Sequence, residues 1–105
     1  LALNYGSHQE IIKAVKSLAL KVQKGKVDPE SIDKKAISES LYTSNMSDPE
    51  LLIRTSGEHR LSNFLLWQIA YSELHFTDVF WPSFSKSDLY EAIDSYQNRR
   101  RRYGE

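Results

Sequence analysis

The sequence has no cysteine, no net charge and no long hydrophobic run, and each absence removes a class of protein. Without cysteine the chain forms no disulfide and no thiolate metal site, which fits a reducing compartment. The 14 basic and 14 acidic residues cancel, so no general attraction to nucleic acid or acidic lipid is expected. No apolar run approaches the roughly 18 residues of a membrane span. We therefore expect a soluble chain with neither a membrane span nor a signal peptide.

The length limits the chain to one domain at most. Its 105 residues are 40% hydrophobic, which is enough for a core. The residues from Leu1 to Gly6 have the pattern of the end of a buried strand, with no initiator methionine before them. Such a strand needs neighbours that the chain barely supplies, so we interpret the chain as a piece of a larger sheet.

The stretch Glu50–Phe76 predicts a strand, a loop, a helix and a second strand. Leu51–Ile53 is a short apolar run typical of a strand covered on both faces, and such strands belong to parallel sheets flanked by helices. Ser62 or Asn63 is placed to cap a helix over Phe64–Ala70, which is apolar almost all round. The stretch therefore predicts an α/β fold with a buried helix.

Helices are also predicted on either side of this stretch. One begins at Ser7, where Glu10 gives the capping-box spacing, and ends at Gly25. A short second helix is predicted over residues 31–40, and a last one is capped by Ser85. The simplest interpretation of all three is that they cover the sheet.

Two arginines close to the carboxyl end of the first strand indicate an anion site. Arg54 ends the strand and Arg60 follows six residues later. Ligands of open α/β sheets collect at the carboxyl ends of strands, and a guanidinium matches the paired oxygens of a phosphate or diphosphate. Ser62 is either a simple helix cap or a hydroxyl that reaches a phosphate oxygen. Arg54 could alternatively be a structural ion-pair partner.

The roles of Glu73, His59 and Arg99–Arg102 are not decided by the sequence pattern alone. An unpaired Glu73 would cost roughly several kcal/mol in a dry interior, so it needs an arginine or a magnesium ion held against a diphosphate. His59 is loop filler as readily as a ligand, because a lone histidine is weak evidence. By pattern alone, Arg99–Arg102 is a solvated or nucleic-acid-facing tail.

The motif IRTSGEHRLSNFLLWQIAYSELHFTDVFWPSF, with LNYG upstream and RRRRYG at the end, closely resembles the carboxyl-terminal portion of bacterial undecaprenyl diphosphate synthases. These are cis-prenyltransferases, and the resemblance runs along essentially the whole chain. It implies that residues 1–105 are the carboxyl-terminal fragment of a single cis-prenyltransferase domain. The implied reaction condenses isopentenyl diphosphate repeatedly onto farnesyl diphosphate with Mg²⁺. The product is undecaprenyl diphosphate, the carrier lipid for cell-wall sugars.

The resemblance also implies roles for single residues. Arg54, Arg60 and Ser62 would bind the diphosphate of isopentenyl diphosphate. Glu73 and His59 would help to hold Mg²⁺.

The resemblance implies roles for three further residues. Glu58 lies inside the motif and would orient the arginines. Arg102 and Gly104 match an Arg-x-Gly signature that reaches across a homodimer interface into the neighbouring site, which reverses the interpretation of the tail.

The chain also departs from the family pattern. The family's aspartate, which binds the allylic diphosphate and Mg²⁺, and the helices of its hydrophobic tunnel are absent, so the chain holds no catalytic residue and should be inactive alone. Ser7 and His8 stand where the family usually has Gly-Arg, Ser83 replaces a common aspartate, and Glu105 replaces a frequent glycine.

The resemblance places the protein in the cytoplasm, with peripheral membrane contact only through its lipid product and no nucleic acid partner. Three alternatives remain: a cis-prenyltransferase of different product length, a non-catalytic partner subunit, or an RNA-binding module that uses the Arg99–Arg102 block.

Overall fold

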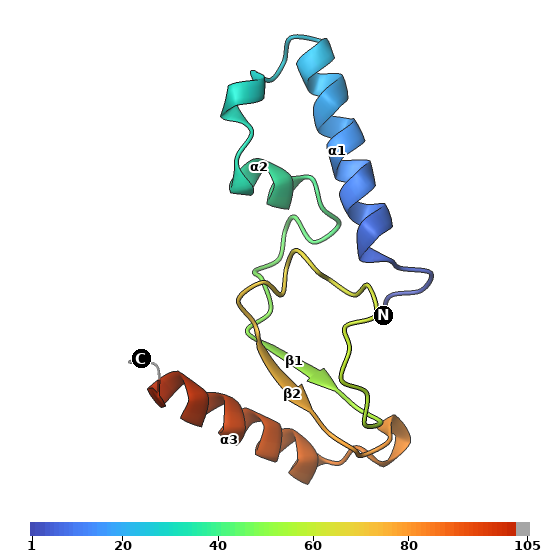
Figure 1. Ribbon diagram of the computed structural model, residues 1–105, viewed down its shortest axis with the longest axis vertical. Coiled ribbons are helices and arrows are strands. Elements are labelled where there is room, and N and C mark those ends of the chain that lie inside the picture. The colour runs from blue at the N-terminus through green and yellow to red at the C-terminus, as the bar shows by residue number, and fades with distance from the viewer. Residues whose placement is uncertain (103–105) are drawn as a thin grey trace. The chain divides into compact units, whose positions relative to one another are not determined.

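The computed structural model describes residues 1–102 as five main elements (Figure 1). Helix α1 spans Ser7–Gln23, α2 spans Lys34–Glu39 and α3 spans Lys86–Arg102, while strands β1 and β2 span Leu51–Arg54 and Glu73–Phe76. Short 3-10 turns cover Pro29–Ser31 and Trp81–Ser83. None of the helices in the described part of the chain is long and apolar enough to cross a membrane.

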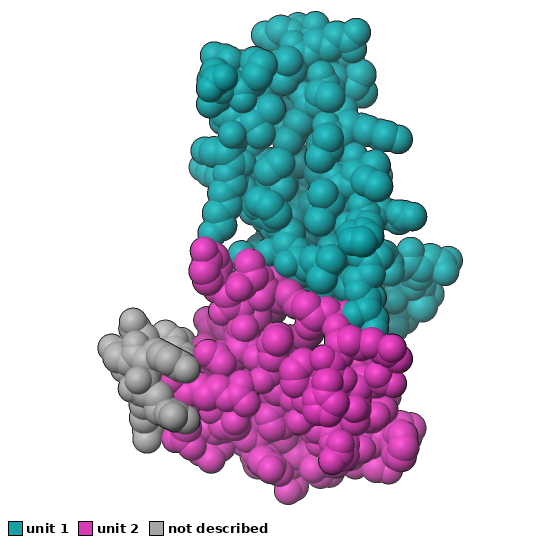
Figure 2. All heavy atoms as spheres, viewed as in Figure 1, with its two compact units in different colours: residues 1–48, 62–68 teal, residues 49–61, 69–105 magenta. Residues whose placement is uncertain are grey.

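The chain folds into two compact units (Figure 2). Unit 1 consists of Leu1–Asp48 and Ser62–Gln68, and unit 2 consists of Pro49–Leu61 together with the chain from Ile69 onward. The segment between the two strands is thus divided between the units. It leaves unit 2 at Ser62 and returns at Ile69.

Unit 2 contains the predicted parallel strand pair, which confirms the α/β fold class. Leu51 lies opposite Glu73 and Arg54 lies opposite Phe76 in the register of β1 and β2. The ladder continues beyond the strands, because the Thr77 N–H donates to the Arg54 carbonyl at 2.9 Å. Helix α3 packs against β2, as expected of a helix that covers a parallel sheet (Figure 1).

Unit 1 is built on α1, whose ends only partly match the sequence pattern. Gly25 has φ +72° and donates its N–H to the Val22 carbonyl, as predicted for a helix C-terminus. The predicted capping box is wrong, because the cap residue is Gly6 and no side chain caps the helix. Ser7 and Glu10 are instead buried and bind other segments.

Two predicted elements do not form. Leu1 and Leu3 are exposed, and no strand occurs before α1 in the described chain. The predicted helix over Phe64–Ala70 is a series of turns, in which Ser62, Asn63 and Leu65 have positive φ. Left-handed residues interrupt a right-handed helix, so Ser62 is not a helix cap and no helix N-terminus follows the arginine loop.

Tertiary hydrogen bonds explain why this apolar pattern does not give a helix. The Ser7 N–H donates to the Asn63 carbonyl at 2.8 Å, and the Leu66 N–H donates to Ser7 Oγ at 3.0 Å. The Asn63 carbonyl, which would accept the first bond of a helix beginning at Phe64, is therefore paired with α1 instead, and the Leu66 N–H is held by a side chain of α1. Helical propensity is a weak preference that such contacts override.

The start of α3 has the predicted capping box. The Ser85 N–H donates to Asp88 Oδ2 at 2.8 Å, and the Asp88 N–H donates to Ser85 Oγ at 3.3 Å. The Ser85 N–H and hydroxyl both favour the ionised carboxylate, which lowers the pKa of Asp88 below its usual 3.8.

The contribution of this cap to stability should be lost in acid. Because the folded-state pKa lies below the unfolded value, the contribution is complete above pH 3.8 and disappears as the pH falls through the folded value. We expect Asp88→Asn to flatten part of the pH dependence of the urea midpoint between roughly pH 5 and pH 2. Equal acid dependence in both proteins would contradict this role of Asp88.

Candidate functional site

The carboxyl edge of β1 is followed by a tight turn over Thr55–Glu58. Ser56 and Gly57 have φ +64° and +68°, and the Glu58 N–H donates to the Thr55 carbonyl at 3.5 Å. Positive φ at both central positions is the pattern of a type I′ turn. The turn reverses the chain directly after Arg54, so Glu58, His59 and Arg60 return towards this edge.

Backbone hydrogen bonds fix this turn to the chain that follows β2. The N–H groups of Ser56 and Gly57 donate to the carbonyls of Val79 and Thr77, both at 2.9 Å. A Cβ at Gly57 would lie 3.2 Å from Asp78 Oδ1, so a residue without a side chain suits this close approach. The loop that carries the ionisable residues therefore begins from a fixed base.

Arg54 and His59 lie on one face of the strand pair. Arg54 is directly opposite Phe76, and directly opposed residues project to the same face. The His59 ring lies 5.2 Å from the Phe76 ring at an interplanar angle of 45°. The structure thus brings two of the predicted site residues to the same edge and face.

Arg60 forms an ion pair with Glu58. Arg60 Nε lies 3.1 Å from Glu58 Oε2, and the two side chains are 75% and 41% exposed. An ion pair this exposed contributes about 0 to 1 kcal/mol, so it orients the guanidinium without holding it strongly. An anion can therefore approach Arg60, while the orienting role of Glu58 stays a prediction.

Glu73 lies away from the two arginines. It is the first residue of β2, three register positions before Phe76, which separates it from the Arg54 position by about 10 Å along the strands. An odd number of positions also places it on the opposite face. The structure therefore does not bring Glu73 to Arg54 and Arg60 within one chain.

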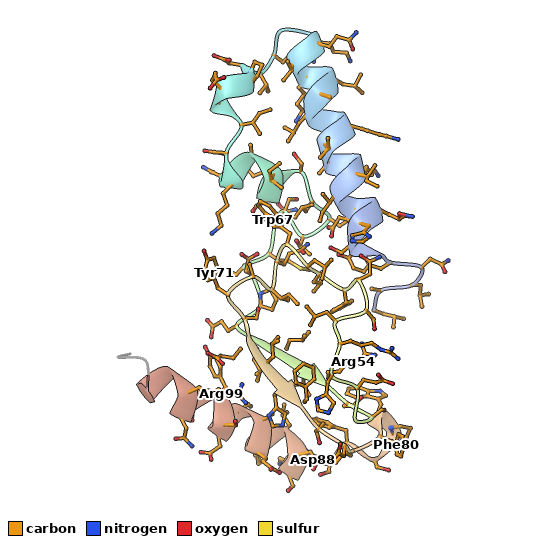
Figure 3. The ribbon with its side chains drawn as sticks, in the orientation of Figure 1. Arg54, Trp67, Tyr71, Phe80, Asp88 and Arg99 are labelled. Atoms are coloured by element: carbon orange, nitrogen blue, oxygen red, sulfur yellow. The ribbon has the colours of Figure 1, made fainter. Side chains whose placement is uncertain are left out.

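The cation beside Glu73 is Arg99 of α3. Arg99 Nη1 lies 3.4 Å from Glu73 Oε2 and also donates to the Leu74 carbonyl. Figure 3 shows Arg54 and Arg99 on opposite sides of the strand pair. The sequence correctly required a cation for Glu73 but did not identify Arg99, which its pattern assigned to an exposed tail.

Three predicted site residues remain: Ser62, Arg102 and Gly104. Ser62 belongs to unit 1 and has φ +52°. Arg102 is the last residue of α3, and Gly104 lies outside the described residues.

The described side chains do not form a complete binding site for a magnesium ion. Within residues 1–102, no three histidine, cysteine, aspartate or glutamate side chains form a metal-binding group. His59 contacts Phe76, whose face is opposite that of Glu73, so these two residues of one chain do not converge on one ion. Magnesium is commonly bound by one or two carboxylates and substrate phosphates, so Glu73 fits the ion only with further oxygen ligands.

A buried polar network in unit 1 was not predicted as such. Glu10 is 1% exposed and accepts hydrogen bonds from the Tyr5 hydroxyl, the Tyr42 N–H and the Gln68 amide. Burial first, and then the hydrogen bond to Glu10, raise the pKa of Tyr5. The only sequence signal was the spacing of Ser7 and Glu10, which was interpreted as a helix cap.

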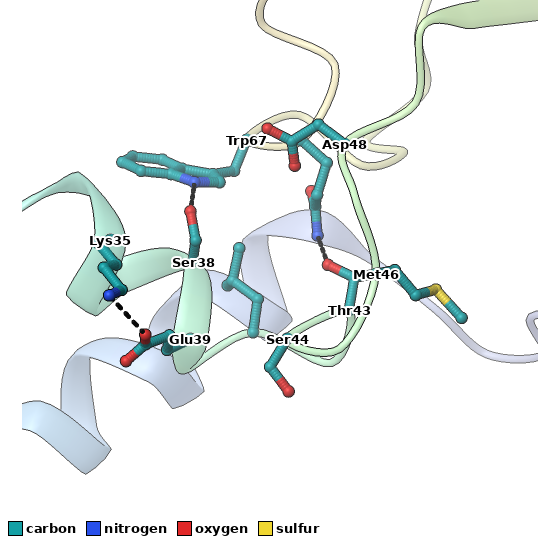
Figure 4. A pocket seen from close by; sticks show the side chains of 10 residues that line it. Lys35, Ser38, Glu39, Thr43, Ser44, Met46, Asp48 and Trp67 are labelled. Atoms are coloured by element: carbon teal, nitrogen blue, oxygen red, sulfur yellow. Dashed lines mark hydrogen bonds and ion pairs between the residues drawn. The ribbon is translucent and has the colours of Figure 1, made fainter.

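A small cavity of about 70 Å³ lies beside this network (Figure 4). Trp67 Nε1 donates to Ser38 Oγ at 3.0 Å, and Gln68 Nε2 donates to Thr43 Oγ1 at 3.1 Å. The Gln68 Oε1 atom is buried without a partner. The cavity has room for water, which is the simplest partner for this oxygen.

Comparison with known proteins now identifies the family. A family model described as "Putative undecaprenyl diphosphate synthase" matches residues 1–104. The chain belongs to this prenyltransferase family. The isoprenyl transferase of Bacillus subtilis (strain 168) is 55% identical to it over 103 residues, which are 98% of this chain and 40% of the relative.

The name of one further relative states a substrate specificity, and that of another does not. A tritrans,polycis-undecaprenyl-diphosphate synthase (geranylgeranyl-diphosphate specific) of Methanocaldococcus jannaschii is 53% identical over 106 residues, covering 99% of this chain and 38% of its own length. The isoprenyl transferase of Prochlorococcus marinus is 54% identical over 104 residues, with the same coverage. The prenyltransferase chain thus spans about two fifths of the length of these relatives.

A solved structure confirms the cis-prenyltransferase fold. Lavandulyl diphosphate synthase from Lavandula x intermedia, in complex with dimethylallyl diphosphate, superposes with a TM-score of 0.87 at 41% identity. The match covers 91% of the prenyltransferase chain and 42% of the lavender protein.

Proposed function

We propose that the full-length protein is a cis-prenyltransferase that adds isopentenyl diphosphate repeatedly to an allylic diphosphate and forms undecaprenyl diphosphate. The observation that carries this proposal is the edge of β1, where Arg54 and the Arg60–Glu58 pair flank a turn fixed by backbone hydrogen bonds. Membership of the family supports the reaction class. The diphosphate ligand of the lavender relative supports the substrate class.

In this proposal Arg54, Arg60 and Ser62 hold the diphosphate of isopentenyl diphosphate. A guanidinium donates two parallel N–H bonds to such oxygens, and a hydroxyl donates one more. The protein has little covalent chemistry to perform. Its main task is to place the double bond of one substrate beside the carbon that loses diphosphate.

We propose that the reaction uses Mg²⁺, which would need oxygen ligands in addition to Glu73 and His59 of this chain. When bound, the ion would neutralise charge on the diphosphate. Glu73 and His59 remain the proposed protein contributors, but they do not meet on one ion within a chain. A homodimer, in which Arg102 and Gly104 reach the neighbouring site, and a cytoplasmic location with peripheral membrane contact complete the proposal.

The allylic substrate is either farnesyl or geranylgeranyl diphosphate. The Methanocaldococcus relative is named as specific for the latter. The RNA-binding alternative is less favourable, because Arg99 of the arginine block is engaged with Glu73 and the Leu74 carbonyl. A non-catalytic partner subunit is the second candidate, and the presence of Arg54 and Arg60 around one turn argues against it.

The proposal is tested by the product of the full-length protein. We expect purified protein, given Mg²⁺, labelled isopentenyl diphosphate and either allylic diphosphate, to form a labelled polyprenyl diphosphate. Extraction and sizing of the lipid measure the product length and the preferred allylic substrate together. Absence of any labelled lipid with both substrates would instead support a partner subunit.

A further inference from the structure

The irregular segment Ser62–Gln68 is bound to the start of α1 by one hydrogen bond between backbone groups and two between a backbone N–H and a side chain. The Ser7 N–H donates to the Asn63 carbonyl at 2.8 Å, and the His8 N–H donates to Asn63 Oδ1 at 2.9 Å. The Leu66 N–H donates to Ser7 Oγ at 3.0 Å. The backbone on both sides of residue 64 is therefore fixed to one turn of helix.

The far end of the segment is anchored by buried side chains. Gln68 is 3% exposed, and its Nε2 donates to Glu10 Oε1 and Thr43 Oγ1, both at 3.1 Å. Ser7 is fully buried and Glu10 is 1% exposed. Loss of a partner from a buried polar group exposes the full desolvation penalty of the group that remains. Any change in these side chains should therefore be transmitted to the segment.

The backbone of the segment requires such anchors. Ser62, Asn63 and Leu65 have φ values of +52°, +62° and +46°. Residues with a Cβ are disfavoured in this region, and they persist there only when surrounding contacts determine the conformation. The described contacts of the segment with α1 provide that constraint.

We propose that Ser7, supported by Glu10 and Gln68, is a positioning residue that holds the Asn63–Leu66 backbone and so fixes the hydroxyl of Ser62 for its diphosphate contact. This inference rests on the proposed function, because it assumes that Ser62 binds the substrate. Ser7 acts through the backbone and makes no substrate contact. Loss of this anchor should weaken a hydrogen bond that Ser62 makes to the bound substrate, so the effect should be measurable as a higher KM for isopentenyl diphosphate.

The test compares two serine substitutions in the full-length protein. Ser7→Ala removes the acceptor of the Leu66 N–H, whereas the control Ser38→Ala removes the acceptor of Trp67 Nε1 on the same segment. We expect Ser7→Ala to raise the KM for isopentenyl diphosphate roughly fivefold or more, with kcat and the allylic KM changed less than about twofold. Ser38→Ala should leave all three within about twofold.

Hydrogen exchange provides a second readout that does not depend on activity. Peptides that cover residues 62–68 should exchange faster in Ser7→Ala than in Ser38→Ala. Asn63→Gly serves as a further variant if Ser7→Ala does not fold. Glycine accepts positive φ, so it removes only the partly exposed acceptor for the His8 N–H, and it should also raise the KM for isopentenyl diphosphate.

The outcomes separate the two proposals. If the wild-type protein makes lipid, two results would overturn the positioning role of Ser7. One is an equal KM for isopentenyl diphosphate in Ser7→Ala and Ser38→Ala. The other is a lower kcat and a lower thermal midpoint in Ser7→Ala with an unchanged KM. If the wild-type protein makes no lipid from either allylic diphosphate, the proposed function fails first.

Discussion

Replacing Arg60 by alanine in the full-length protein should weaken the binding of isopentenyl diphosphate tenfold or more. The Arg60 side chain is 75% exposed and pairs with Glu58, so much of its guanidinium is available to a diphosphate. A charge-assisted hydrogen bond contributes on the order of 1.5–3 kcal/mol, which corresponds to at least a tenfold change. Arg54→Ala should have a similar effect, because Arg54 ends β1 at the same edge. The KM for isopentenyl diphosphate, measured at saturating allylic diphosphate, is the relevant quantity.

Two controls define this result. Lys35→Ala removes an exposed cation of α2 that pairs with Glu39 at 3.9 Å, and it should leave the KM unchanged. Arg60→Lys keeps the charge but loses the planar fork, so it should restore only part of the affinity. If Arg54→Ala and Arg60→Ala both retain wild-type KM and kcat, the diphosphate site lies elsewhere.

Replacing Glu10 by glutamine should lower the free energy of unfolding more than any other substitution proposed for this protein. Oε1 of Glu10 accepts from the Tyr5 hydroxyl and the Gln68 amide, and Oε2 accepts from the Tyr42 N–H at 2.7 Å. Glutamine has one acceptor oxygen, and its NH₂ group must face one of these donors. A buried donor without a partner costs about 1–3 kcal/mol, so we expect a loss of this size in the free energy of unfolding.

The matched control is the same substitution at an exposed glutamate. The Glu39 side chain is 62% exposed and pairs with the exposed Lys35, so Glu39→Gln should change the free energy of unfolding by less than about 0.5 kcal/mol. Urea unfolding of the full-length variants measures both. Equal midpoints for the two variants would show that the Glu10 network contributes little to stability.

Local patterns predicted several elements correctly. The apolar run at Leu51–Ile53 is strand β1, and the Ser85–Asp88 spacing is the capping box of α3. The capping box is a set of hydrogen bonds between near neighbours, and a short apolar run marks a segment that favours a strand, so both can be inferred from a few consecutive residues. The long motif also identified the family, because so many specific residues in one order rarely coincide.

The same type of pattern misplaced the segment after Ser62. Its apolar residues suit a helix, but the Asn63 carbonyl and the Leu66 N–H pair with Ser7, some sixty residues earlier in the sequence. A local pattern contains no information on so distant a partner. The Ser7–Glu10 spacing failed for the same reason, since both side chains bind other segments in place of the helix end.

The sequence by itself determined the family, the α/β class, the parallel strands and the need of Glu73 for a cation. Tertiary structure alone decided that this cation is Arg99 and that Glu73 lies on the opposite face from Arg54. The physical reason is the register of the strands. A parallel pair fixes which residue lies opposite which, and that depends on how two distant segments align, which the residue types at one position do not specify.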